Sequence, residues 1–391
     1  MPEPRARRQL IEGIGAAMMS SSSLALINNE FTGKERAGAF GLFGGLAGIA
    51  GVLGPVLGGW LTTEASWRWA FRINVVLAPI LIALVRAGVR ELRRTGPRPR
   101  LDLAGALSVT LGLFFLVFGI IEGTGYGWWT PTRPLEIGGH RIDPDGLSVV
   151  PIALALAVVC LGLFVLLERA KDRRGGDPLY PFSRLRYRSF HLGMLTTGLL
   201  AAGEFTMFFV LSIVLQRDLG LSALETGLWI LPFGVTAILG AGTGVWLAQK
   251  LGATRTVTVG MALEAVGLVW VALRIGPDVT LPGLIPAILT YGLGMGFATA
   301  QLGNVTLSEV PPIIAGVASG VNNTVRQVGS ALGIAAVGAA YDGGGGRPAV
   351  LIAAGAVLLG AVASLLIPAD RSTPAAGATS GPDPGDASAE E

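Results

Sequence analysis

Residues 41–60 read GLFGGLAGIAGVLGPVLGGW, an apolar run without a charged side chain. A helix needs about 20 largely apolar residues to cross the hydrocarbon core of a bilayer, so this run is long enough to be a membrane span. Its glycines leave one face of the helix almost without side chains, which lets a neighbouring helix pack closely. Pro55 removes a backbone hydrogen bond and predicts a bend in the same helix.

The rest of the chain has the same apolar character. Of its 391 residues, 51% are hydrophobic and only 14% are charged, which is too little charge to solvate an ordinary globular surface. About eleven runs reach spanning length, near residues 10–28, 39–61, 70–88, 103–121, 148–167, 191–215, 226–247, 256–274, 283–303, 315–340 and 348–367. Because such runs are about twice the length of a spanning strand, they predict an all-α integral membrane bundle rather than a barrel.

Lysine and arginine predict how the bundle is oriented, since these residues accumulate in cytoplasmic loops. Thirteen of the 29 lie in the connectors around residues 86–100 and 169–188, which are therefore expected in the cytoplasm. The chain is then a multi-pass protein of the cell membrane with a cytoplasmic carboxyl terminus. With an odd number of spans, the same rule leaves the amino terminus outside, where its arginines are poorly placed: Arg5, Arg7 and Arg8.

Pairs of glycines spaced four residues apart recur along the chain. They occur at Gly240 and Gly244, Gly292 and Gly296, Gly316 and Gly320, and Gly329 and Gly333. Such pairs allow close helix packing. Together with Pro232 and Pro286, they predict helices that can slide and bend, as rocking-bundle transporters require.

Several motifs resemble those of the major facilitator superfamily. The antiporter motif of that family, Gly-x8-Gly-x3-Gly-Pro-x2-Gly-Gly, is matched by Gly41, Gly54, Pro55, Gly58 and Gly59, with Ala50 in place of the second glycine. Further matching blocks lie at residues 67–71, 102–105, 219–222 and 323–329. Together they resemble the fourteen-helix drug:proton antiporter branch.

This resemblance implies a division of the chain into four parts. Residues 10–28 are similar to the family's fourth helix, so the first three helices are expected to be absent. Residues 1–100 would then be a three-helix remnant of the first half with a basic cytoplasmic loop, and residues 101–170 an inserted helix pair. Residues 171–367 would form a complete six-helix second half, followed by a disordered cytoplasmic tail at 368–391.

Three charged residues lie midway along expected spans and are candidates for the transport site: Glu204, Glu264 and Arg326. An ionised side chain at the bilayer centre costs about 2.5–3.5 kcal/mol, and it usually faces a cavity or a partner. We interpret Glu204 as a proton- or cation-coupling residue, because a buried carboxyl group can load and release a proton. The alternative is a protonated glutamate that is hydrogen-bonded to a neighbouring helix.

The other candidates carry weaker signals. Glu264 has no polar neighbour in its own helix. Arg326 belongs to the family pattern Asn-x-x-Arg that begins at Asn323, and it is expected to pair with a carboxylate or to cap broken backbone. Gln301 is expected at an inner gate or in an interhelical hydrogen bond. The acids at helix ends, Glu122 and Glu168, are predicted to be solvated.

The resemblance implies a proton-coupled secondary transporter that exports small hydrophobic or cationic compounds by alternating access. Its partners would be the solute, protons and membrane lipid, and it would act as a monomer without nucleic acid. The sequence has no phosphate-cradling Gly-x4-Gly-Lys-Ser/Thr motif, which argues against ATP-driven pumping. A single cysteine and two separated histidines provide no metal ligand set, and no cofactor is expected.

Two alternatives belong to other classes of protein. The first is a non-transporting membrane protein, either a relic, a ligand sensor or the product of a mis-called start. Another ~100 apolar-rich residues encoded upstream would restore three spans and argue against it. The second is a membrane enzyme, which no nucleophile-base pair or metal cluster supports.

Overall fold

The computed structural model describes residues 11–19, 22–23, 26, 50, 53–54, 56–88, 102–137, 140–142, 146–276 and 279–368. Within these ranges the chain is a helical bundle. The strands described are β1 (Leu135–Ile137) and β2 (His140–Ile142), which form a short antiparallel hairpin between the expected spans at 103–121 and 148–167. The all-α prediction is confirmed apart from this hairpin.

The described helices follow the expected spans in order. They are α3 (Trp67–Gly88), α4 (Leu103–Ile121), the short α5 (Gly123–Tyr126), α6 (Val149–Arg173), α7 (Arg188–Ile213), α8 (Ala223–Leu251), α9 (Ala253–Arg274), α10 (Leu281–Leu307), α11 (Pro312–Gly344) and α12 (Gly346–Leu365). Two π-helical turns, η1 (Leu61–Ala65) and η2 (Val214–Asp218), adjoin α3 and α7. The expected span at 10–28 is described in part, mainly at 11–19, and the span at 39–61 lies largely outside the described residues.

Among the described helices, 8 are long and apolar enough to cross a membrane. The long helix α11 is not one of them, because its centre carries the polar sequence Asn322-Asn323-Thr324 and then Arg326-Gln327. A helix with such a centre needs other helices around it, since lipid cannot satisfy its polar groups.

Local capping explains why several helices begin where they do. Ser222 accepts a hydrogen bond from the Glu225 N–H at 3.2 Å, and the Glu225 carboxylate accepts the Ser222 N–H at 2.8 Å. This reciprocal capping box satisfies two backbone donors, and α8 therefore starts three residues before the expected boundary. Asp102 and Ser148 cap α4 and α6 with their side chains.

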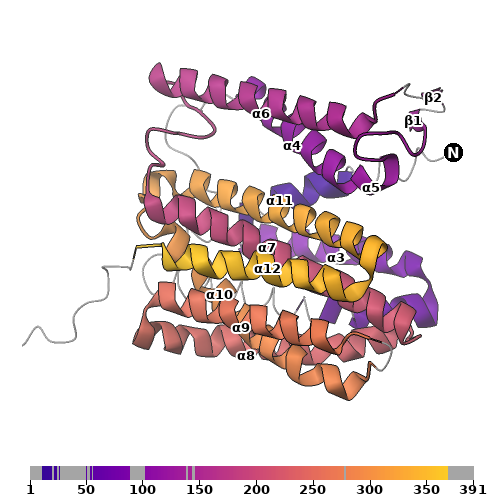
Figure 1. Cartoon of the computed structure of the whole chain (residues 1–391). Helices are drawn as coiled ribbons and strands as arrows, with labels where there is room; N and C mark the ends of the chain where they lie inside the picture. Colours follow the sequence, from indigo (N-terminus) through magenta and orange to yellow (C-terminus); the bar gives the residue numbers. More distant parts are fainter. Residues whose placement is uncertain are drawn as a thin grey trace, which may run out of the picture.

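Helices α7 to α12 pack into one bundle, and α4 and α6 pack against each other beside it (Figure 1). In the bundle, α10 lies against α8 and α9, whereas α7 lies against α11 and α12. The α4–α6 pair reaches the bundle through α11. The buried core lies within the bundle. Each helix from α7 to α12 contributes to it, from Leu200 of α7 to Ala361 of α12.

Glycines form the contact between α8 and α10. A Cβ atom on Gly240 would lie 2.5 Å from the Leu293 carbonyl oxygen, and one on Gly296 would lie 2.2 Å from the Ala237 carbonyl oxygen. The contact between α11 and α7 is similar, since Gly329 and Gly333 lie against backbone atoms of Gly198 and Ala202. These glycine pairs hold helices together as predicted, whereas Gly316 and Gly320 face no described atom within 4 Å.

Candidate functional site

An ion pair lies inside the α7–α12 bundle. Glu204, in the middle of α7, is 2% exposed, and Arg326 of α11 donates a hydrogen bond from Nη2 to Glu204 Oε2 at 2.9 Å. The other carboxyl oxygen, Glu204 Oε1, has no hydrogen-bond partner within the described residues. The Arg326 side chain is 43% exposed, so its guanidinium group lies at the edge of the bundle core rather than within it.

A second carboxyl group lies next to the Glu204–Arg326 pair. Glu264 of α9 is 0% exposed, and neither of its oxygens has a hydrogen-bond partner in the described part of the chain. It lies against α7, because a Cβ atom on Gly203 would be 3.5 Å from Glu264 Oε1. The nearby hydroxyl group of Tyr291 donates to the Gly203 carbonyl at 3.5 Å. The structure thus brings Glu264 beside Glu204, although the two acids lie on different helices.

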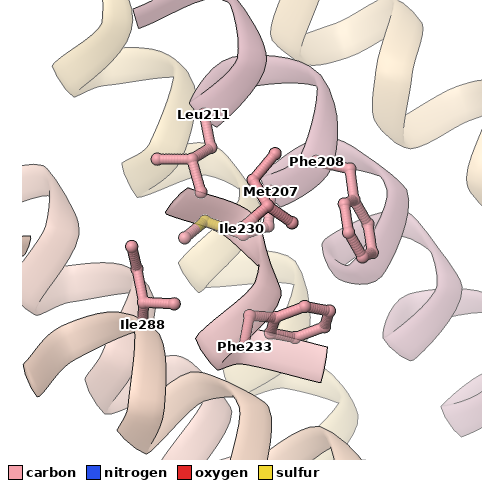
Figure 2. Close-up of a pocket in the computed structure, with 6 residues that line it drawn as sticks. All are labelled: Met207, Phe208, Leu211, Ile230, Phe233 and Ile288. Atoms are coloured by element: carbon pink, nitrogen blue, oxygen red, sulfur yellow. The ribbon is translucent and has the colours of Figure 1, made fainter. Parts of the chain in front are cut away.

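An apolar pocket lies beside α7, about one helical turn along the chain from Glu204 (Figure 2). Its lining comes from three helices: Met207, Phe208 and Leu211 of α7, Ile230 and Phe233 of α8, and Ile288 of α10. The Phe208 and Phe233 rings are 4.8 Å apart and nearly perpendicular, and the Phe233 ring is 5.4 Å from that of Tyr291. Packed aromatic rings therefore connect the pocket to the tyrosine beside Glu264.

The two acids differ in what can neutralise them. Glu204 can be neutralised either by Arg326 or by a proton. The described residues place no lysine or arginine against Glu264, so no described side chain neutralises its charge, whereas a bound proton would. This part of the bundle can bind protons beside an apolar surface.

The remaining candidates, Asn323 and Gln301, lie on α11 and α10. Asn323 is half-buried on α11, but its neighbour Asn322 is the residue that accepts a hydrogen bond from Thr197 of α7, at 3.1 Å. Gln301 is 7% exposed on α10. It lies between Tyr291, which faces Gly203, and Thr306, which faces Gly193.

The antiporter-motif residues are described only in part. Gly41 and Pro55 lie outside the described residues. Gly54 and Gly58 have no described atom within 4 Å of an added Cβ. Gly59 is in close contact with the start of α8, since its Cβ would lie 2.5 Å from the Ala223 carbonyl oxygen.

One prediction about helix-end acids is wrong. Glu168 was expected to be solvated, but it is 0% exposed and accepts a hydrogen bond from the Tyr180 N–H at 2.9 Å. It is buried because the chain after α6 folds back over the end of the helix and because Gly105 of α4 leaves room for its carboxyl group. Glu122 keeps part of its side chain exposed and pairs with Arg133 at 2.6 Å.

Comparison of the sequence with known protein families identifies the family of this chain. The Major Facilitator Superfamily model matches residues 9–334 and, in an overlapping second match, residues 193–385. The chain belongs to the major facilitator superfamily. As a major facilitator with several apolar helices, it is a multi-pass membrane protein, and the family is one of transporters rather than enzymes.

Several curated major facilitators are similar to this chain. The probable actinorhodin transporter of Streptomyces coelicolor is 33% identical over 88% of this chain and 57% of its own length. The puromycin resistance protein of Streptomyces alboniger is 34% identical, over 83% of this chain and 61% of its own length. The lincomycin resistance protein of Streptomyces lincolnensis is 32% identical, over 83% and 62% respectively. The chain therefore spans about three fifths of the relatives that it matches.

Among solved structures, an auto-inhibited peptide transporter of the POT family has a similar fold. Its TM-score is 0.54 with 17% sequence identity, and the match covers 90% of this chain and 75% of that chain. At this identity the similarity concerns the fold alone.

Proposed function

We propose that this chain acts in a proton-coupled exporter of small hydrophobic or cationic compounds, of the antibiotic-efflux kind. The observation that carries the proposal is the buried Glu204, which is paired with Arg326 beside an apolar pocket in the middle of the bundle. A coupled carrier needs a group that can exchange a proton for another partner during the transport cycle. The relatives support the substrate class, since their names describe transport of or resistance to antibiotics.

The proposal includes an arrangement in the membrane. Helices α7 to α12 would be the second half of the transporter and α4 with α6 the inserted pair of the fourteen-helix branch, with protons and solute crossing beside α7. The positions of lysine and arginine support a cytoplasmic carboxyl terminus. Reporter tags in the 86–100 and 122–147 connectors test this orientation, and tags that report the same face of the membrane would contradict it.

The first test replaces Glu204 with glutamine. Glu204→Gln keeps the shape of the side chain but removes the exchangeable proton, so uncoupler-sensitive efflux of a fluorescent dye is expected to fall by roughly tenfold or more. Efflux is measured in cells that express the complete reading frame, with and without a proton uncoupler, at equal amounts of membrane-inserted protein.

The matched control is Glu225→Gln at the exposed start of α8, where glutamine preserves the capping box. It is expected to transport as the unchanged protein does. Unchanged uncoupler-sensitive efflux in the Glu204 variant would refute its coupling role, and no efflux by the unchanged protein would contradict transport itself.

The pocket provides a second test. Phe233→Leu keeps an apolar side chain but removes the ring between Phe208 and Tyr291. Loss of aromatic stacking, worth about 0.5–1.5 kcal/mol, is expected to weaken efflux of large aromatic dyes more than that of small aliphatic cations. Competition between the two classes of compound measures the change, and an equal effect on both would remove the pocket from substrate selection.

A further inference from the structure

Two carboxyl groups face each other at one end of the α4–α6 pair, apart from the proposed transport site. Asp102 caps α4 by accepting the Gly105 N–H at 2.8 Å, and Glu168 of α6 accepts the Tyr180 N–H at 2.9 Å. Both are enclosed, with Glu168 0% and Asp102 8% exposed. The end that holds them is the one from which the chain continues into the linker to α7.

Gly105 makes this approach possible. A Cβ atom there would lie 2.4 Å from Glu168 Oε1 and 2.7 Å from Asp102 Oδ2, so both oxygens border the same small space. Neither oxygen has a hydrogen-bond partner within the described residues. Two buried acceptors in this position lack a donor, and a proton on one of the carboxyl groups would supply it.

The charges around Asp102 and Glu168 also require one proton between these two carboxyl groups. Lys171 forms a salt bridge with Asp102 Oδ1 and can neutralise one of the two acids. Two other charged residues on these turns of α6 have contacts elsewhere in the described part of the chain: Asp172 accepts hydrogen bonds from Ser183, and Arg169 lies over the Phe182 ring at 5.1 Å. Two enclosed carboxyl groups beside one ammonium group are electrically neutral only when they hold one proton.

Glu168, rather than Asp102, carries this proton. Burial acts to raise the pKa of Asp102, but the hydrogen bonds from Lys171 and from the Gly105 N–H, together with the one that a protonated Glu168 would donate, outweigh burial and lower this pKa below its usual value. Asp102 therefore stays ionised in ordinary buffers and accepts a hydrogen bond. Among the described residues, no salt bridge joins a cation to Glu168, and Glu168 is the group that can donate.

Glu168 also connects this end of the pair to the rest of the bundle. The linker to α7 is held on the last turns of α6 by the Tyr180 N–H, the Phe182 ring and Ser183. Tyr180 packs in turn against a buried cluster at the start of α7 and α11, made of Leu185, Phe190, Val310, Ile314 and Ala318. A change at Glu168 would therefore alter the packing of the linker where the α4–α6 pair meets the bundle.

We propose that Asp102 and Glu168 form a proton-binding site separate from the membrane-embedded acids, in which one shared proton locks α4, α6 and the linker to α7 together. When the pH rises and this proton leaves, two carboxylates face each other at Gly105. Their repulsion loosens the end of the α4–α6 pair and releases the Tyr180 linker. The site makes the docking of this pair depend on pH, whether or not the chain transports a solute.

Glu168→Gln tests the site. The glutamine amide donates permanently to Asp102, and its carbonyl oxygen still accepts the Tyr180 N–H, so the variant mimics the protonated state at every pH. Thermal unfolding of the purified full chain in detergent is followed from about pH 5 to about pH 9. The melting midpoint of the unchanged protein is expected to fall toward high pH by about 2 °C or more relative to that of the variant.

The control is Glu122→Gln, at the opposite end of α4, which should keep the pH profile of the unchanged protein. Infrared difference spectra between low and high pH provide a second readout. One component of the carboxyl C=O stretching band should titrate in the unchanged protein and be lost in Glu168→Gln, while the components from other acids remain. Parallel melting profiles for the unchanged protein and Glu168→Gln, or the same carboxyl difference spectrum in both proteins, would overturn the proposal.

Discussion

Gly296→Ala is expected to lower the stability of the bundle by about 1–3 kcal/mol through overpacking, less the gain of up to about 1 kcal/mol that alanine brings to a helix. The added Cβ would lie 2.2 Å from the Ala237 carbonyl oxygen and 2.6 Å from the Ala241 nitrogen. Both are backbone atoms of α8, which cannot rotate away as a side chain can. Helices α8 and α10 would have to move apart, and the melting midpoint of the purified protein should fall by about 2 °C or more.

Gly303→Ala is the matched control for this prediction because it lies on the same helix. Gly303 is exposed, and an added Cβ there meets no described atom within 4 Å. Alanine at this position should leave the midpoint unchanged or raise it slightly through its higher helix propensity. Equal midpoints for the two variants would show that α8 and α10 do not depend on the close contact at Gly296.

Much of the fold could be predicted because membrane spans are long and apolar. The runs at 226–247 and 256–274 correspond to α8 and α9, and their boundaries differ by a few residues where caps such as Ser222 extend the helix. Helix α11 is less apolar than its neighbours, but the run at 315–340 was still long enough to predict it. The pairing of helices in space, such as α10 between α8 and α9, leaves little trace in hydropathy.

The candidate site could be predicted only in part. Glu204 and Arg326 were recognised as costly charges of opposite sign at mid-span, but their contact joins residues 122 positions apart. Tyr291 gave no signal, since a tyrosine in an apolar helix is commonly a packing residue. Glu264 lacks polar neighbours in its own helix, and the groups beside it come from α7 and α10 instead.

Glu168 shows why a carboxyl group at a helix end is hard to interpret from sequence. Such residues are usually solvated, and burial here depends on the fold of the linker and on a glycine of another helix. The spacing of Asp102 and Gly105 and the lysine three residues after Glu168 were available signals. They become meaningful once α4 and α6 are known to pack side by side.

Arg326→Gln is expected to be the most damaging single change to the candidate site. It would leave Glu204, whose side chain is 3% exposed, buried without its cation. Breaking a fully buried pair costs about 3–5 kcal/mol, and the partial exposure of Arg326 reduces this to roughly 1–3 kcal/mol. The loss should be smaller at low pH, because a proton then removes the unpaired charge. Thermal unfolding of the purified protein at several pH values measures it.

A double-mutant cycle separates pairing from general damage. If Glu204 and Arg326 stabilise the bundle as a pair, Glu204→Gln combined with Arg326→Gln should be more stable than Arg326→Gln alone, with a coupling energy of about 0.5–3 kcal/mol. The double variant has two neutral amides in contact and should unfold with little dependence on the charge of this site. It should nevertheless lack uncoupler-sensitive efflux, since it has no exchangeable proton at position 204. Additive losses of stability would show that the 2.9 Å contact contributes no energy, and coupled efflux by the double variant would assign proton binding to another residue.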